Sequence, residues 1–132
     1  MTTLREPRTG HPYYMHDMVL GQPASIARIL SEEGDSIKSL AGLVASSERV
    51  HIVGIGTSWH AALVGEHLLR LAGGREDARA WNSFEFCTYP PKLGARDTVV
   101  VLSHSGVKQY SAKALEMAKA AGAKTANVTS LE

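Results

Sequence analysis

Short apolar runs alternate with helix-like segments from residue 50 onward, and this alternation constrains the fold more than any other feature of the chain. The apolar runs have the length and the β-branched content of buried strands. Parallel strands need a crossover connection, which a helix usually supplies, so a strand–helix–strand repeat is typical of a parallel sheet. The sequence therefore predicts an α/β fold: a doubly wound parallel sheet with helices on both faces and the carboxyl ends of its strands as the binding edge.

Four strands and their connecting helices are placed by periodicity and by the glycines that follow them. The expected strands are Val50 to Gly54, Ala78 to Asn82, Thr98 to Ser103 and Thr125 to Thr129. The expected helices are Ser58 to Ala72, a short helix or turn at Phe84 to Tyr89, and about Lys108 to Ala121. Before the first strand, helical spacing from Ala24 to about Val44 predicts one long helix, or two broken near Gly34-Asp35. We expect an extended arm to precede this helix.

Length and composition limit the organisation and the partners. With 132 residues, 44% hydrophobic and 20% charged, the chain suits one core, so we expect an arm and helix in residues 1–45. Residues 46–132 are then the first part of a binding domain whose sheet is incomplete at the C-terminus. A net charge of +1 without charge runs argues against nucleic acid and membrane partners. A lone cysteine, Cys87, and the lack of a long apolar run predict a cytoplasmic protein.

Two of the expected strands end in turns of small polar residues, and these turns carry the chemistry. Gly54 to Ser58 joins the first strand to a helix, and Ser103 to Gly106 joins the third strand to another. Glycines let an anion approach the backbone, and the free N–H groups and dipole of a helix start favour negative charge. The pattern predicts a phosphate site, although serine and glycine are also ordinary cap and turn residues.

Other ligand classes fit less well. Gly54 and Gly56 supply two glycines of the dinucleotide fingerprint, but Trp59 stands where the third belongs. The Gly-Lys-Ser/Thr end of a P-loop is absent. The six histidines show no metal-ligand spacing, so we expect neither a metal nor a cofactor.

At these turns the sequence resembles the sugar isomerase (SIS) domain family, and within it the isomerase half of the glutamine:fructose-6-phosphate amidotransferases, the glucosamine-6-phosphate synthases. That family has a Gly-Thr-Ser turn after its first strand and a Ser-Gln-Ser-Gly turn after its third. Its Tyr-Met, Gln-Pro and Glu-Phe pairs are similar to Tyr14-Met15, Gln22-Pro23 and Glu85-Phe86. The resemblance spans about residues 14–129 and implies a flavodoxin-like SIS fold.

Carried over residue by residue, the resemblance implies a sugar phosphate held at the two turns. His104 replaces the family's glutamine, and Lys108 stands where the synthases have a phosphate-binding threonine, as a cation that can serve the same anion. The residues implied to bind the substrate are Gly56, Thr57, Ser58, Ser103, His104, Ser105 and Lys108.

The catalytic residues stay unknown at this stage. The family's glutamate, histidine and lysine for isomerisation come from a second SIS repeat and a C-terminal tail, so we expect residues 1–132 alone to be inactive. Within the chain, His60 and Glu85 are candidates near the edge, for which packing or helix capping is the competing interpretation.

The resemblance implies a hexose 6-phosphate or an amino-sugar phosphate as ligand. It implies a module of a sugar-phosphate isomerase, aminotransferase or deaminase, in a homodimer or higher oligomer. The alternative is a regulator's phosphosugar-sensing module without catalysis. Such regulators usually carry a helix-turn-helix ahead of the module, and residues 24–44 show no basic recognition helix.

Overall fold

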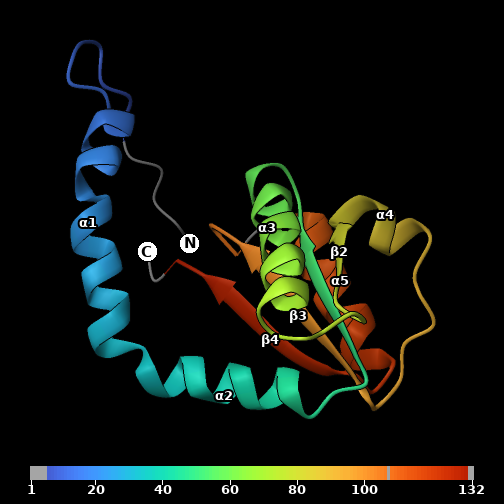
Figure 1. Ribbon diagram of the computed structural model, residues 1–132. Helices are drawn as coiled ribbons and strands as arrows, with labels where there is room; N and C mark the ends of the chain where they lie inside the picture. Colours follow the sequence, from blue (N-terminus) through green and yellow to red (C-terminus); the bar gives the residue numbers. More distant parts are fainter. Residues whose placement is uncertain (1–5, 107, 131–132) are drawn as a thin grey trace. The chain divides into compact units, whose positions relative to one another are not determined.

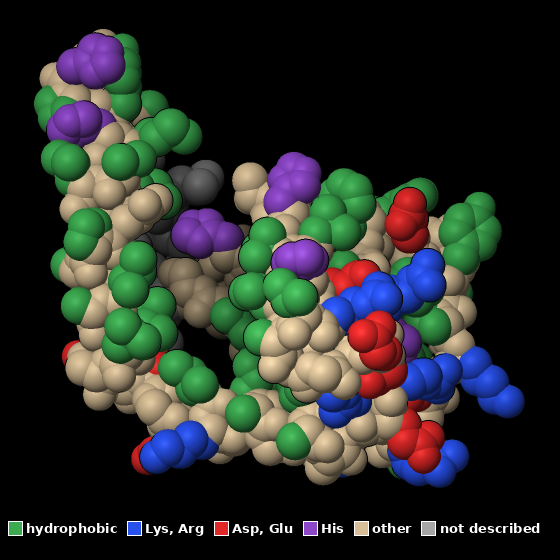
Figure 2. Space-filling model, viewed as in Figure 1, with side chains coloured by type: hydrophobic (Ala, Val, Ile, Leu, Met, Phe, Trp, Pro, Cys, Tyr) green, Lys and Arg blue, Asp and Glu red, His purple; other side chains and the backbone are tan. Residues whose placement is uncertain are grey.

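The computed structural model describes residues 6–106 and 108–130. The chain divides into two compact units, of which the first ends at Leu40 and the second begins at Ala41. In the first unit, residues 6–13 contain neither helix nor strand, and α1 (Tyr14–Glu32) follows. Next comes α2 (Gly34–Ala45), which runs across the division. No side chain of residues 6–40 is buried. Figure 2 shows hydrophobic side chains along α1.

The beginning of α1 corrects the sequence prediction, which had a helix starting at Ala24 with Pro23 ahead of it. The helix starts ten residues earlier, at Tyr14, and Pro23 lies inside it. A proline inside a helix removes one backbone hydrogen bond and crowds the preceding turn. Because α1 has 19 residues, enough backbone hydrogen bonds remain before and after Pro23 for the helix to continue through it. The alternative of two helices is confirmed, because the break falls at Glu33.

The second unit contains a four-stranded parallel sheet with the order β2-β1-β3-β4. Its strands are β1 (Arg49–Gly54), β2 (Arg79–Asn82), β3 (Asp97–Ser103) and β4 (Lys124–Thr129). Between them run α3 (Thr57–Leu71), α4 (Ser83–Thr88) and α5 (Gln109–Ala120). The predicted α/β parallel sheet is confirmed. In the described part of the chain, no helix combines the length and the apolar character needed to cross a membrane.

Two layers of core explain why the central strands are apolar throughout. On one face, Val53, Val99 and Val101 pack with residues of α4 and α5. On the other face, Val50 and Ile52 pack with Ala62 of α3. Figure 1 shows α3 and α5 on opposite sides of the sheet. Because both faces of β1 and β3 are covered, these strands lose the alternating polar pattern of a one-sided sheet.

The amino-terminal ends of the two central strands are tied by a paired charge. Arg49 begins β1 and donates from Nε and Nη2 to the two carboxylate oxygens of Asp97, both at 2.8 Å. Asp97 is only 2% exposed, and burial by itself would raise its pKa. The hydrogen bonds from Arg49 and from the Gly94 N–H outweigh burial and hold the pKa of Asp97 below its usual range. The amino edge of the sheet is thus electrostatically satisfied.

The tight connection from β1 to α3 generates a stability prediction. A Cβ added to Gly54 would collide with the backbone of Ser58 and Trp59, which cannot move without shifting the start of α3. We expect Gly54→Ala to lower the free energy of unfolding by about 2 kcal/mol or more, measured by urea denaturation. Gly42→Ala in α2 is the matched control, because an added Cβ there meets nothing within 4 Å. It should leave stability unchanged or raise it by about 0.5–1 kcal/mol. Equal stability of the two variants would contradict this account.

Candidate functional site

The two polar turns lie side by side at the carboxyl edge of the sheet. β1 and β3 are hydrogen-bonded neighbours, with Val53 level with Val101, so the turns that follow them begin together. The chain leaves β1 toward α3 on one face and β3 toward α5 on the other. Such a divergence is the switch point at which open α/β sheets bind ligands. The structure therefore brings together the predicted residues of both turns.

The first turn presents the start of α3 to this edge. Gly56 is its N-cap residue, with φ of 60° and ψ of −129°, a backbone conformation that glycine adopts without strain. The Gly56 carbonyl accepts hydrogen bonds from the Trp59 N–H at 3.0 Å and the His60 N–H at 3.4 Å. No side chain caps the helix, so the first N–H groups, at Thr57 and Ser58, are not bonded by a capping side chain. They lie at the carboxyl edge of the sheet, at the positive end of the helix dipole.

The second turn contains a buried hydroxyl group without a partner. Ser103 ends β3 and is 4% exposed, and its Oγ makes no hydrogen bond to any described residue. Leaving such a group unpaired costs about 1–3 kcal/mol. Ser105 is half-buried, His104 is exposed, and Gly106 has φ of 68°. Lys108 is exposed as the N-cap residue of α5, without a side-chain cap, and adds a positive charge beside the turn.

A small cavity of about 210 Å³ adjoins the second turn between α5 and the ends of β3 and β4. Its lining includes Ser103, Gly106, Ser111 and Asn127. Ser111 is 2% exposed, and its Oγ lies 3.5 Å from the Oγ of Ser83. The unpaired Ser103 hydroxyl therefore borders a space that is lined by both polar and apolar side chains, Leu115 and Glu116 among them, with room for a ligand group or several waters.

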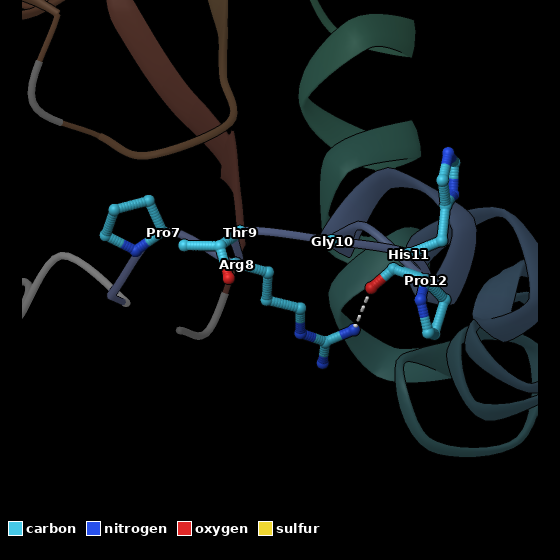
Figure 3. A pocket seen from close by; sticks show the side chains of 6 residues that line it. All are labelled: Pro7, Arg8, Thr9, Gly10, His11 and Pro12. Carbon is cyan, nitrogen blue, oxygen red and sulfur yellow. Dashed lines mark hydrogen bonds between the residues drawn. The ribbon is translucent and has the colours of Figure 1, made fainter.

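A second hollow lies in the first unit, ahead of α1, and is lined by Pro7 to Pro12 (Figure 3). The Arg8 guanidinium donates to the Pro12 carbonyl at 2.8 Å and contacts the Asp17 carboxylate at 2.7 Å. Because its cation is already paired, this hollow offers less to an anion than the two turns do.

The other sequence candidates are exposed. His60 lies in the first turn of α3 with its ring against Trp59, centroids 5.6 Å apart. Glu85 lies in the first turn of α4, just after β2 ends. Sequence reasoning missed Thr129, which the β3–β4 register sets level with Ser103. The available signal was that a fourth parallel strand also ends at this edge.

Below the edge, β1 carries a buried histidine. His51 is 4% exposed, and its Nδ1 accepts a hydrogen bond from Nε1–H of Trp81 at 3.0 Å. Its Nε2 has no hydrogen-bond partner among the described residues. Burial lowers the pKa of His51 from its usual 6.5, so the imidazole is neutral at pH 7.

Relatives of the chain are sugar-phosphate enzymes by name. A glutamine–fructose-6-phosphate aminotransferase (isomerizing) from Gloeobacter violaceus is 34% identical over 129 residues, covering 92% of this chain and 21% of the relative. A protein of the same name from Aeropyrum pernix is 33% identical, covering 94% of this chain and 20% of the relative. The chain thus spans about a fifth of the length of these relatives. No protein-family model matches it.

A solved structure agrees in fold. The C-terminal domain of glucosamine-fructose-6-phosphate aminotransferase from Francisella tularensis aligns with a TM-score of 0.77 and 19% identity, covering 94% of this chain and 36% of that domain. The chain resembles one SIS domain of these aminotransferases in sequence and shares its fold. The predicted resemblance and fold class are confirmed. The ligand contacts of individual residues stay predictions.

The buried His51 generates a prediction about pH. Its pKa is lowered by folding, so its contribution to stability is present above the unfolded-state value of about 6.5 and is lost as the pH falls below it. We expect the free energy of unfolding to decrease between pH 7 and pH 5, with a shallower slope in His51→Gln. Ser36→Ala, at an exposed position of α2, is the control and should keep the wild-type slope, because it removes no titratable group. Parallel slopes in all three proteins, measured by urea denaturation, would contradict a role of His51.

Proposed function

We propose that this SIS chain binds a hexose 6-phosphate or an amino-sugar phosphate through its two turns. It does so as a module of a sugar-phosphate isomerase, aminotransferase or deaminase in the cytoplasm. In this proposal residues 1–45 lie ahead of the binding domain and include α1 and α2, and residues 46–132 form the first part of that domain. The proposed ligand contacts are Gly56, Thr57, Ser58, Ser103, His104, Ser105 and Lys108.

The observation that carries the proposal is the unpaired hydroxyl of Ser103. Buried polar groups in folded proteins nearly always have a hydrogen-bond partner, so an orphan at a sheet edge calls for a ligand or an ordered water. Ser103 lies at the switch point of the sheet, beside the uncapped start of α3. The start of α3 favours an anion at this place, because its first N–H groups are donors that no side chain caps.

A phosphate monoester suits this set of donors. Its oxygens accept several hydrogen bonds, and each bond to a charged group contributes about 1.5–3 kcal/mol. The hydroxyls of Thr57, Ser58, Ser103 and Ser105 supply such donors around two helix N-termini. The names of the relatives specify fructose 6-phosphate, which supports a phosphorylated hexose as the ligand.

Removal of one hydroxyl from each turn tests the proposal. We expect Thr57→Ala and Ser105→Ala each to weaken fructose 6-phosphate binding about tenfold, because each loses one hydrogen bond to the phosphate. The dissociation constants are measured by NMR titration, which also reads weak binding. Ser36→Ala, at an exposed position of α2, should bind as the wild type does. Wild-type affinity in both turn variants would overturn the assignment.

We also propose that the chain forms a homodimer or higher oligomer through its apolar first unit. Ile26, Ile29 and Ile37 are 58%, 42% and 48% exposed, and Leu40 extends the same helical spacing. Exposed apolar stripes of this kind mark protein contacts, and a helix without a core of its own gains stability from packing.

Light scattering tests the oligomer. We expect a dimer or larger species at micromolar concentration and a shift toward monomer in Ile26→Glu, because the carboxylate would be buried unpaired in the contact. The control is Ser25→Glu, which adds the same charge one residue away on a different face of α1. A monodisperse wild-type monomer would contradict the proposal.

A further inference from the structure

The end of β4 contacts the second turn, and this contact involves a residue without a role so far. The His104 carbonyl accepts a hydrogen bond from the Ser130 N–H at 3.1 Å and from Oγ1–H of Thr129 at 3.4 Å. The same Thr129 hydroxyl oxygen lies 3.5 Å from the place where a Cβ on Gly106 would be. Thr129 therefore contacts the turn at the His104 carbonyl and lies close to Gly106.

We propose that Thr129 is a positioning residue, whose hydroxyl holds the Ser103–Gly106 turn in the conformation that presents its donors to the anion. The inference rests on the proposed function, since it concerns the same site. Thr129 itself has no contact with the ligand in this proposal. It acts through the His104 carbonyl, whose orientation determines where the following N–H groups and the Ser105 side chain point.

Two features of the turn make such an anchor necessary. Gly106 has φ of 68°, and glycine readily adopts other conformations, so the turn is not rigid by its own sequence. The Ser103 side chain makes no hydrogen bond to a described residue that would hold the turn from below. The Ser130 N–H and the Thr129 hydroxyl thus join the turn to the sheet from β4, level with the end of β3. Holding donors in place before the ligand arrives reduces the ordering cost of binding.

The test compares Thr129→Val with Thr129→Ser in the full chain. Valine keeps the β-branched shape that suits a strand but lacks the hydroxyl, whereas serine keeps the hydroxyl. We expect Thr129→Val to weaken fructose 6-phosphate binding about three- to tenfold and to speed amide hydrogen exchange at Ser130, whose N–H donates to the His104 carbonyl, both followed by NMR. Thr129→Ser should restore both quantities toward wild-type values.

Thr125→Val is the matched control, because Thr125 lies on the same strand and the same sheet face, four residues before Thr129. It should change neither binding nor exchange at Ser130. Wild-type binding and exchange in Thr129→Val would overturn the inference, as would an effect that Thr125→Val shares or that serine fails to rescue. If the wild-type chain binds no sugar phosphate, the proposed function fails, and the exchange rates still decide whether Thr129 holds the turn.

Discussion

The parallel pairing of β1 with β3 is the interaction on which the rest of the second unit depends. Val50, Val53, Val99 and Val101 are at most 1% exposed, and burial of each such side chain contributes about 1.5–3 kcal/mol. Apolar residues on both faces make this pair the centre of the sheet rather than an edge. The pairing also joins the ends of the two strands, so the force that builds the core is the one that assembles the candidate site.

The two ends of this strand pair differ in how far their polar groups are satisfied. At the amino end, Arg49 and Asp97 form two hydrogen bonds, and the buried carboxylate has a full set of donors. At the carboxyl end, Ser103 is unpaired and the helix starts have no side-chain caps. These polar groups at the amino end all have partners, whereas those at the carboxyl end lack them and cost stability. This difference is expected of a binding site, where a ligand supplies the missing partners.

Local sequence signals placed the strands and turns well because each is a short-range property. Gly56, Gly106 and Gly122 have positive φ at the turns or helix ends where glycine was expected to act. The beginning of α1 was misplaced because a proline usually marks the first turn of a helix. In the structure the helix continues on both sides of Pro23. Thr129 was missed because its contact with His104 links residues 25 positions apart.

The sequence by itself determined the α/β class, the residue types at both turns and the resemblance to the SIS family, because strand periodicity, glycine placement and hydroxyl side chains are read along the chain. The tertiary structure decided which strands are neighbours and which groups meet. The order β2-β1-β3-β4 sets the two turns together, leaves the Ser103 hydroxyl without a partner and brings Thr129 beside the turn. These facts depend on pairing between distant segments, which follows from the burial of the whole core and not from any local pattern.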